Sequence, residues 1–192
     1  MNTEKLRNLV FTALLAGLIL VLGMTPLGLI PLGFTNVTLY CIPVVVGTLL
    51  LGWRAGLVLG FCFGFTSAWD AFTSPSTLVA LVVQHSPILT VVMCFLPRLL
   101  VPLAAHFAHG ALAEKRGGRL GALPVAAIAG SLTNTVFYLG LMLLFYILLG
   151  LDAAPVLGLI GGTALIAGGS EAIAAAILVP PILLALQKVR KR

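Results

Sequence analysis

The fold is decided by a long apolar stretch near the start of the chain. From Arg7 to Ile30 it reads RNLVFTALLAGLILVLGMTPLGLI. A bilayer core needs about 20 predominantly apolar residues in a helix, and this stretch supplies them before Pro31-Leu32-Gly33 interrupts it. Its apolar run is longer than the roughly 7–15 residues of a signal-peptide core, and no clear small-x-small cleavage site follows it. We therefore predict a retained first transmembrane helix over about 7–30.

The composition of the whole chain indicates the same class of protein. Of its 192 residues, 60% are apolar and 8% are charged, and the mean hydropathy is +1.18. Soluble domains usually carry about 25% charged residues, so this chain has too few charges to cover a soluble globule. The net charge of +6 does not indicate nucleic-acid binding, because the basic residues are scattered over the ends of apolar stretches without interleaved aromatic residues. Attraction to anionic inner-leaflet lipids explains this charge more simply.

Five further apolar stretches follow the first. They predict spans over about 37–52, 55–72, from after Ser74-Pro75 to about 96, 121–149 and 156–186. The second span is short and contains Pro43 and Gly47, which fits either a kinked span or a helix interrupted at a cavity. The segment Leu99–Leu120 is left between the fourth and fifth spans, and we expect it at the cytoplasmic surface. The prediction is an all-α polytopic membrane protein of six transmembrane helices, forming a single domain over 1–192.

The basic residues set the orientation of these spans. With six spans in place, all eleven Lys and Arg residues fall on one side of the membrane, including Arg98 at the end of the fourth span. Asp70 and Asp152 lie at or near the loops of the other side, which contain no basic residue. Short basic loops resist translocation, so we predict that both termini are cytoplasmic.

Small residues indicate how one of the helices packs. Gly56, Gly60 and Gly64 recur every four residues, and Ala68 continues the row. Such a row lets the backbone of a neighbouring helix approach closely. Three cysteines lie inside predicted spans without a CxxC spacing, and the two histidines of the segment Leu99–Leu120 lack an acidic or thiol neighbour. We therefore predict no metal site and no cofactor.

Polar side chains inside the predicted spans are the candidates for function. They are costly in a bilayer and therefore face a cavity or a partner. They gather between the midplane and the outer surface, while the inner halves of the spans are almost wholly apolar. This asymmetry predicts a pocket that opens to the outside and is closed towards the cytoplasm, unlike a channel, which needs polar lining at every depth. The predicted substrate-binding residues are Asn36, Thr38, Trp69, Gln84, His85, Asn134, Tyr138 and Glu171.

Several of these residues have a structural alternative. Asn134 could hydrogen-bond between helices, and Trp69 could belong to the aromatic belt at the membrane surface. Gln84 and His85 are adjacent and so project in different directions. Glu171 is the strongest candidate, since a mid-span carboxylate without a paired base must be protonated, hydrogen-bonded or bound to a ligand. No Lys or Arg reaches the outer half in this arrangement, so neutral, cationic or weakly acidic solutes fit best.

The order of several short motifs resembles a known family. The residues concerned are Pro31-Leu32-Gly33-Phe34-Thr35-Asn36-Val37-Thr38, Ile42-Pro43 with Gly47, Leu51-Gly52-Trp53-Arg54-Ala55-Gly56 leading into Gly60 and Gly64, Gly130-Ser131-Leu132-Thr133-Asn134-Thr135, and Glu171 with Pro180-Pro181. This ordered set covers essentially the whole chain and is similar to the S components of energy-coupling factor transporters.

The resemblance implies a six-helix protein of a prokaryotic cell membrane that captures a vitamin or similar micronutrient from outside. Such proteins dock on a module of one transmembrane coupling protein and two ATPase subunits. Small residues four apart on the first helix serve docking in this family, which here implies Ala13 and Gly17. The first outer loop acts as a lid, which would fall on Pro31–Asn36. The pattern looks most like the branch of pantothenate and riboflavin binders, with pantothenate favoured and riboflavin next.

Two other classes of function stay open at this stage. A stand-alone facilitator or channel would need polar lining in the inner halves, which the sequence lacks. An intramembrane enzyme is less favoured, because the chain has no HExxH motif and His85, the single histidine in a predicted span, has no serine partner of the rhomboid type. The chain also lacks a GxxxxGK[ST] loop, so it cannot energise transport itself.

Overall fold

The computed structural model describes residues 3–25, 29–31, 36–38, 40–113 and 120–191 of the chain. Helices account for almost all of this part. They are α1 (Thr3–Gly23), α2 (Cys41–Leu51), α3 (Trp53–Thr73), α4 (Thr77–His85), α5 (Pro87–Ala113), α6 (Leu123–Leu148), α7 (Ala154–Leu159) and α8 (Leu165–Lys191). A π-helical turn, η2 (Ile160–Ala164), joins α7 to α8, and two short strands, β1 (Leu29–Pro31) and β2 (Asn36–Thr38), form a hairpin between α1 and α2.

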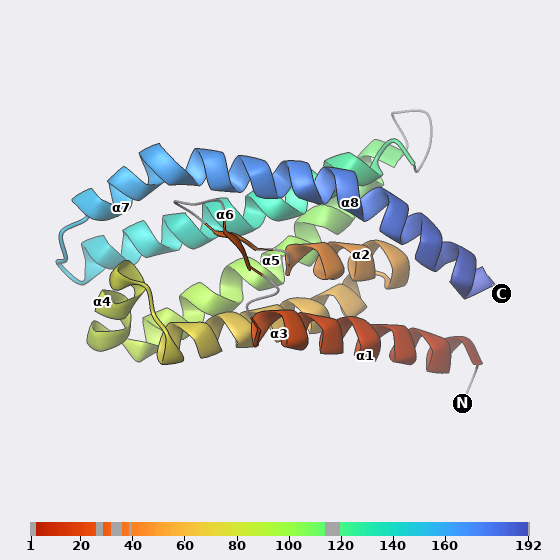
Figure 1. Ribbon diagram of the computed structural model, residues 1–192, viewed down its shortest axis with the longest axis horizontal. Helices are drawn as coiled ribbons and strands as arrows, with labels where there is room; N and C mark the ends of the chain where they lie inside the picture. The colour runs from red at the N-terminus through yellow and green to blue at the C-terminus, as the bar shows by residue number, and fades with distance from the viewer. Residues whose placement is uncertain (1–2, 26–28, 32–35, 39, 114–119, 192) are drawn as a thin grey trace.

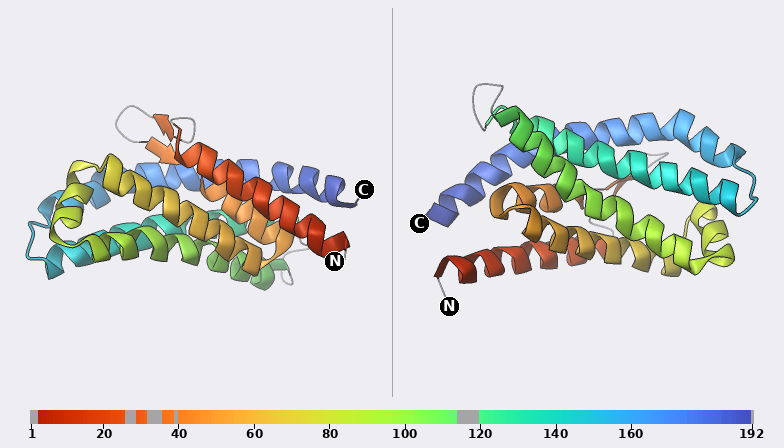
Figure 2. Two further views of the ribbon diagram at one scale, coloured as in Figure 1. Left: turned by 90° about the horizontal axis from the view of Figure 1, so that it is seen from below. Right: turned by 180° about the vertical axis from the view of Figure 1, so that it is seen from behind.

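The long helices run side by side and form an elongated bundle. Both ends of the described chain lie at one end of the bundle, and α4 and α7 lie at the other (Figures 1 and 2). We call these the terminal end and the distal end. Helix α5 packs against both α3 and α6, α6 packs against α8, and α1 packs against α3.

The described residues contain five helices that are long and apolar enough to cross a membrane, namely Thr3–Gly23, Trp53–Thr73, Pro87–Ala113, Leu123–Leu148 and Gly168–Arg190. Large apolar side chains are exposed on these helices, among them Leu14, Ile88 and Ile173. Such extensive exposed apolar surface is typical of a protein that lies in lipid. The prediction of a helical membrane protein with several spans is confirmed in this form.

The second predicted span, over 37–52, is wrong in length. Helix α2 has 11 residues, which at about 1.5 Å per residue cover roughly half of a 30 Å hydrocarbon core. All residues from Cys41 to Thr48 are buried, because α1, α3, α5, α6 and α8 pack around this helix. Gly52 follows it with a φ of 96°, a value that glycine adopts without steric cost, and the chain turns directly into α3.

The glycine row of α3 lies where α3 packs against α5. A Cβ at Gly60 would lie 2.6 Å from the backbone oxygen of Arg98, and a Cβ at Gly56 would lie 2.7 Å from Cβ of Pro102. Gly64 meets a side chain of α5 in the same way. The close helix packing predicted from the four-residue spacing is therefore confirmed.

The fourth predicted span, which ended at about 96, is wrong. The short helix α4 covers its first half, and after a break α5 continues to Ala113. Most of the segment Leu99–Leu120, expected at the cytoplasmic surface, is therefore part of a bundle helix. Pro97 and Pro102 lie inside α5. Prolines normally end a helix, but in a membrane bundle neighbouring groups satisfy the backbone oxygens that a proline leaves free.

The first predicted span ends earlier than expected. Helix α1 stops at Gly23, and the chain then forms the antiparallel hairpin, which is the one departure from the all-α prediction among the described residues. The register of the hairpin is Leu29↔Thr38, Ile30↔Val37 and Pro31↔Asn36. Strand β2 contacts α8, about midway along the bundle (Figure 1). Within the predicted lid Pro31–Asn36, residues 32–35 lie outside the described residues.

Buried apolar side chains form two clusters along the bundle. One surrounds α2, which lies towards the terminal end (Figure 1), and includes Leu59 and Phe63 of α3. The other lies towards the distal end and includes Met93 of α5 with Met142 and Tyr146 of α6. The polar side chains considered next lie between these two clusters.

Candidate functional site

Arg98 is buried near the middle of α5, with 7% of its surface exposed. The sequence-based prediction placed it at the cytoplasmic end of a span with the other basic residues, and that prediction is wrong because α5 continues past it. A charged side chain within a membrane bundle is costly and marks a candidate functional site.

Pro97 explains how the Arg98 side chain is held. In a regular helix, the backbone oxygen of residue 93 accepts a hydrogen bond from the N–H of residue 97. Proline has no N–H, so the Met93 oxygen is left free, and Nη1 of Arg98 donates to it over 3.1 Å. The guanidinium therefore folds back along α5 towards the distal end.

Two aromatic rings flank the guanidinium. Its Cζ atom lies 4.5 Å from the ring centroid of Tyr138 on α6 and 5.3 Å from that of Phe63 on α3. Both distances are within the roughly 6 Å limit of cation–π contacts. The ring of Phe63 also packs edge-on against the ring of Tyr40, with centroids 5.6 Å apart. These contacts hold a cation among apolar helices without neutralising its charge.

Arg98 is the centre of a group of polar side chains from separate parts of the chain. We call this group the central polar cluster, and its members are Tyr40, Arg98, Asn134, Tyr138 and Glu171. Asn134 precedes Tyr138 by one turn of α6, so both lie on the same face of that helix. Glu171 is half-buried on α8 and lies within electrostatic range of Arg98. The cluster thus joins α5, α6, α8 and the residue before α2.

Several polar atoms of the central polar cluster are buried and make no hydrogen bond within the described part of the chain. They are Nε of Arg98, Oδ1 of Asn134 and the hydroxyl of Tyr40. Leaving such an atom unpaired costs about 1–3 kcal/mol, and folded proteins rarely tolerate it without a reason. A bound solute that carries an anionic group and other polar groups would satisfy these atoms.

The charge of the cluster corrects an expectation drawn from the sequence. No base was expected near Glu171, and anionic solutes were therefore disfavoured. Arg98 supplies that base, and its planar guanidinium matches a carboxylate in a two-pronged geometry. The site can therefore bind an anion although it lies among apolar helices.

The structure separates the other predicted residues from this cluster. Trp69 is 49% exposed on α3, and Gln84 and His85 are exposed on α4 at the distal end, where Nδ1 of His85 lies 2.8 Å from the Leu81 oxygen. Asn36 and Thr38 lie in β2, with side chains outside the described part. Of the eight predicted residues, the structure brings Asn134, Tyr138 and Glu171 to one place.

The predicted docking residues lie on the outer face of α1. Ala13 is exposed, and a Cβ added at Gly17 would meet no atom within 4 Å in the described structure. The neighbouring Leu14 and Leu18 are exposed as well. This face of α1 is therefore open to another helix.

Sequence reasoning missed Arg98 and its neighbour Phe63. The signal that identifies Arg98 is the apolar sequence on both sides of it, because the window within Pro87–Ala113 has a mean hydropathy of 2.1. The prediction that a helix ends at Pro97 divided this apolar stretch into two parts. Phe63 has no polar group, and only the packing of α3 on α5 reveals its role.

Comparison with known proteins gives consistent matches. The sequence profile of the family described as ECF transporter, substrate-specific component, matches residues 7–183 of this chain. The chain is 33% identical over 162 residues to the Pantothenic acid transporter PanT of Lactococcus lactis, covering 80% of this chain and 79% of that protein. It is 29% identical over 143 residues to the Pantothenate transporter PanT of Leuconostoc mesenteroides, covering 71% and 68% respectively.

Proposed function

This chain belongs to the substrate-specific (S) components of energy-coupling factor transporters, and from that membership we propose that it captures pantothenate at the central polar cluster. The family and the two named relatives are transporters, which confirms the prediction that the chain is not an enzyme. The relatives' names supply the solute, and the cluster supplies a chemical reason for it.

The observation that carries the proposal is the buried guanidinium of Arg98 with its unpaired Nε. Pantothenate carries a carboxylate, an amide and hydroxyl groups. Its carboxylate binds Arg98, and this pair is strengthened because water is largely excluded from the site. Asn134 and Tyr138 bind the amide and the hydroxyl groups. Glu171 accepts a hydrogen bond from a hydroxyl group at the far end of the solute.

The remaining predicted residues belong to the entry route in this proposal. Asn36 and Thr38 lie in the hairpin, about midway along the bundle. Irregular backbone at such a depth in a membrane must face protein or water. Trp69, Gln84 and His85 lie near the distal end, where the solute first meets the protein. They contact it during entry and not at the carboxylate.

The charges at the two ends of the bundle support one orientation. Lys5, Arg54 and Lys188 are exposed near the terminal end, whereas Asp152 is exposed at the distal end. Because basic flanks stay inside, we propose that the terminal end is cytoplasmic in a prokaryotic cell membrane. With α2 counted as a half-length member, six helices cross or enter the bilayer.

Delivery of the solute requires an energy source that the chain lacks. We propose that the face of α1 around Ala13 and Gly17 docks on a transmembrane coupling protein that is associated with two ATPase subunits. Small residues on an open helix face allow close approach of a second helix in lipid. The surrounding lipid bilayer otherwise covers this face.

The test is a titration of the purified protein with pantothenate by isothermal calorimetry, without ATP. We expect one bound molecule per chain. Arg98→Gln should weaken binding roughly 10- to 150-fold, because a hydrogen bond to a charged group contributes about 1.5–3 kcal/mol. Arg54→Gln, at an exposed arginine near the terminal end, is the matched control and should bind like the wild type.

Two outcomes would overturn this proposal. Equal affinities for Arg98→Gln and Arg54→Gln would show that the carboxylate does not bind Arg98, and tight binding of riboflavin in place of pantothenate would assign the chain to another solute. Vesicles containing only this chain should not release trapped pantothenate. Free release would favour a facilitator.

A further inference from the structure

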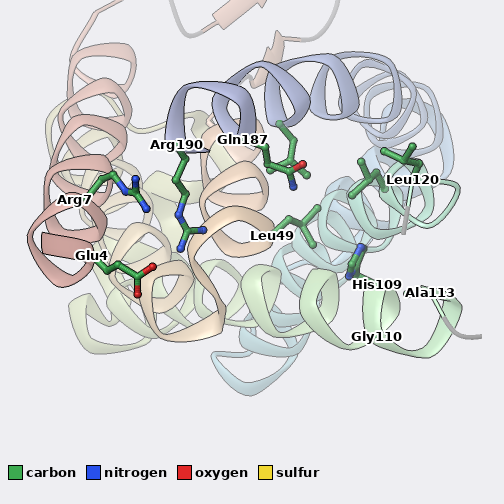
Figure 3. Close-up of a pocket in the computed structure, with 11 residues that line it drawn as sticks. Glu4, Arg7, Leu49, His109, Gly110, Ala113, Leu120, Gln187 and Arg190 are labelled. Atoms are coloured by element: carbon green, nitrogen blue, oxygen red, sulfur yellow. The ribbon is translucent and has the colours of Figure 1, made fainter. Parts of the chain in front are cut away.

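A second polar site lies at the terminal end of the bundle, away from the central polar cluster. It is an open-sided cavity of about 870 Å³ bordered by α1, α2, α5, α8 and the start of α6 (Figure 3). We call it the terminal cavity. Its volume falls in the roughly 300–1,000 Å³ range of ligand pockets and gives far more room than a bare phosphate ion needs. The sequence had led us to expect an apolar, closed inner end.

Basic and polar side chains from three helices point into the terminal cavity. Figure 3 shows Arg7 of α1 and Arg190 of α8 on one side of it, with Gln187 of α8 and His109 of α5 on the other. Glu4 of α1 is the one acidic side chain among the described lining residues. With two arginines and one glutamate, the described part of the lining carries an excess of positive charge.

The two arginines differ in what they already bind. Arg190 donates through Nη1 to the backbone oxygen of Leu50, in the last turn of α2, so part of its guanidinium has a structural partner. Nε of Arg7 is buried and makes no hydrogen bond within the described part of the chain. A buried donor without a partner is costly, and an anion in the cavity would satisfy it.

The other lining residues that the structure describes are apolar or glycine. Leu49 of α2, Leu123 of α6 and Leu183 of α8 line the same cavity. Leu6 and Val189, which neighbour the cavity residues on α1 and α8, are exposed on the outside of the bundle. An occupant with a charged head and an apolar continuation therefore matches the cavity better than a soluble anion does.

We propose that the terminal cavity binds the phosphate headgroup of an anionic phospholipid. Basic pockets between helices on the cytoplasmic side of a membrane protein suit such headgroups. The phosphate pairs with Arg7 and Arg190, His109 and Gln187 donate to the headgroup oxygens, and the glycerol end lies on the leucines. Glu4 opposes the anion and limits the affinity.

The experiment measures lipid retention by the full-length protein in detergent. The protein is incubated with phosphatidylglycerol or with phosphatidylcholine and analysed by native mass spectrometry. We expect several-fold more retained phosphatidylglycerol than phosphatidylcholine. Arg7→Gln should lower phosphatidylglycerol retention several-fold, and Glu4→Gln should raise it. Arg190 is left unchanged because it also holds α2.

Matched controls separate this proposal from simpler explanations. Arg54→Gln removes an exposed arginine near the same end of the bundle that does not line the cavity, and its lipid retention should equal that of the wild type. Equal losses in Arg7→Gln and Arg54→Gln would overturn the proposal, since only net charge would then matter. Displacement of the lipid by inorganic phosphate at equal concentration would also overturn it, in favour of a soluble anion.

Pantothenate titration of the same variants keeps this proposal distinct from the proposed function. Arg7 and Glu4 lie outside the central polar cluster, so both variants should bind pantothenate like the wild type. Loss of lipid retention with intact pantothenate binding supports the terminal cavity as a separate site. Failure of the wild type to bind pantothenate would overturn the proposed function and leave the lipid-binding proposal unaffected.

Discussion

Among single residues, Pro97 determines how the neighbouring Arg98 side chain is held. The proline frees the oxygen of Met93, and the arginine next to it uses that oxygen as an anchor over 3.1 Å. A guanidinium anchored at one nitrogen loses less freedom when it binds an anion, and such preorganisation raises affinity. Pro97 is thus a positioning residue for the proposed carboxylate partner.

Replacing Pro97 by alanine tests this role. The new N–H at residue 97 would donate to the Met93 oxygen and release Nη1 of Arg98. We expect pantothenate affinity to fall roughly fivefold, the equivalent of about 1 kcal/mol for one hydrogen bond. Thermal stability should not fall, because alanine favours the helix over proline. Calorimetric titration and a thermal unfolding curve in detergent measure both quantities.

Pro102→Ala is the matched control, since Pro102 is the other proline inside α5. Alanine keeps the Cβ that lies near Gly56, and the added N–H falls one turn beyond the Arg98 side chain. Affinity should stay near the wild-type value. The same loss in both variants would mean that helix geometry as a whole, and not the Met93 oxygen, sets the affinity.

At the scale of elements, the contact between α3 and α5 fixes the place of the central polar cluster. Gly60 lies against the backbone oxygen of Arg98, and three residues further along α3, Phe63 contacts the guanidinium of the same residue. The distance between the two helices therefore determines whether ring and cation can meet. A side chain at residue 60 would therefore disturb both the backbone and the side chain of Arg98.

Gly60→Ala should push the two helices apart. The added Cβ would lie 2.6 Å from a backbone oxygen, which cannot move aside as a flexible side chain could. Overpacking of this kind costs about 1–3 kcal/mol, so the thermal unfolding midpoint and pantothenate affinity should both fall. Gly140→Ala on α6, where a Cβ would meet no atom within 4 Å in the described structure, should change neither. A Gly60→Ala variant as stable as the wild type would contradict this view of the contact.

The sequence predicted those elements whose apolar runs end in clear breaks. Helices α3 and α6 lie within two residues of the predicted spans over 55–72 and 121–149. Helix α5 was mispredicted because a proline followed by an arginine resembles the end of a span, and only tertiary packing shows that a bundle satisfies both residues. Helix α2 was predicted too long because Val37, Leu39 and Tyr40, which precede it, extend its apolar pattern towards the N-terminus.

The sequence predicted those site residues that are polar and lie within a long apolar helix. Asn134, Tyr138 and Glu171 stand out because each interrupts a long apolar helix. Trp69, Gln84 and His85 interrupt helices too, but the sequence does not show which face of a helix turns outward when every face is apolar. The sequence did not identify Arg98 as a site residue, because its depth in the bundle depends on where α5 ends.

Across the bundle as a whole, both ends of the described chain and the exposed Lys5, Arg54 and Lys188 share one end (Figure 2). If this end is cytoplasmic, opposite ends of the protein should differ in their access to a membrane-impermeant reagent. Ser74, exposed between α3 and α4, and Lys188, exposed near the end of α8, are suitable positions for that comparison.

Ser74→Cys should react with an impermeant maleimide in intact cells, whereas Lys188→Cys should react only after the membrane is permeabilised. Cys62→Ala provides the background, because Cys41 and Cys94 are buried and only Cys62 is partly accessible. The background protein alone should show little labelling under either condition. Labelling of Lys188→Cys in intact cells would reverse the proposed orientation.

Tyr146 gives the distal end a link to the binding site. Its hydroxyl donates to the backbone oxygen of Leu78 over 2.6 Å. This hydrogen bond links the short helix α4 to α6, the helix that carries Asn134 and Tyr138. If α6 adjusts when the central polar cluster binds pantothenate as proposed, this hydrogen bond passes the movement on to α4. A fluorescent dye attached to α4 is therefore expected to report occupancy of a pocket that it never touches.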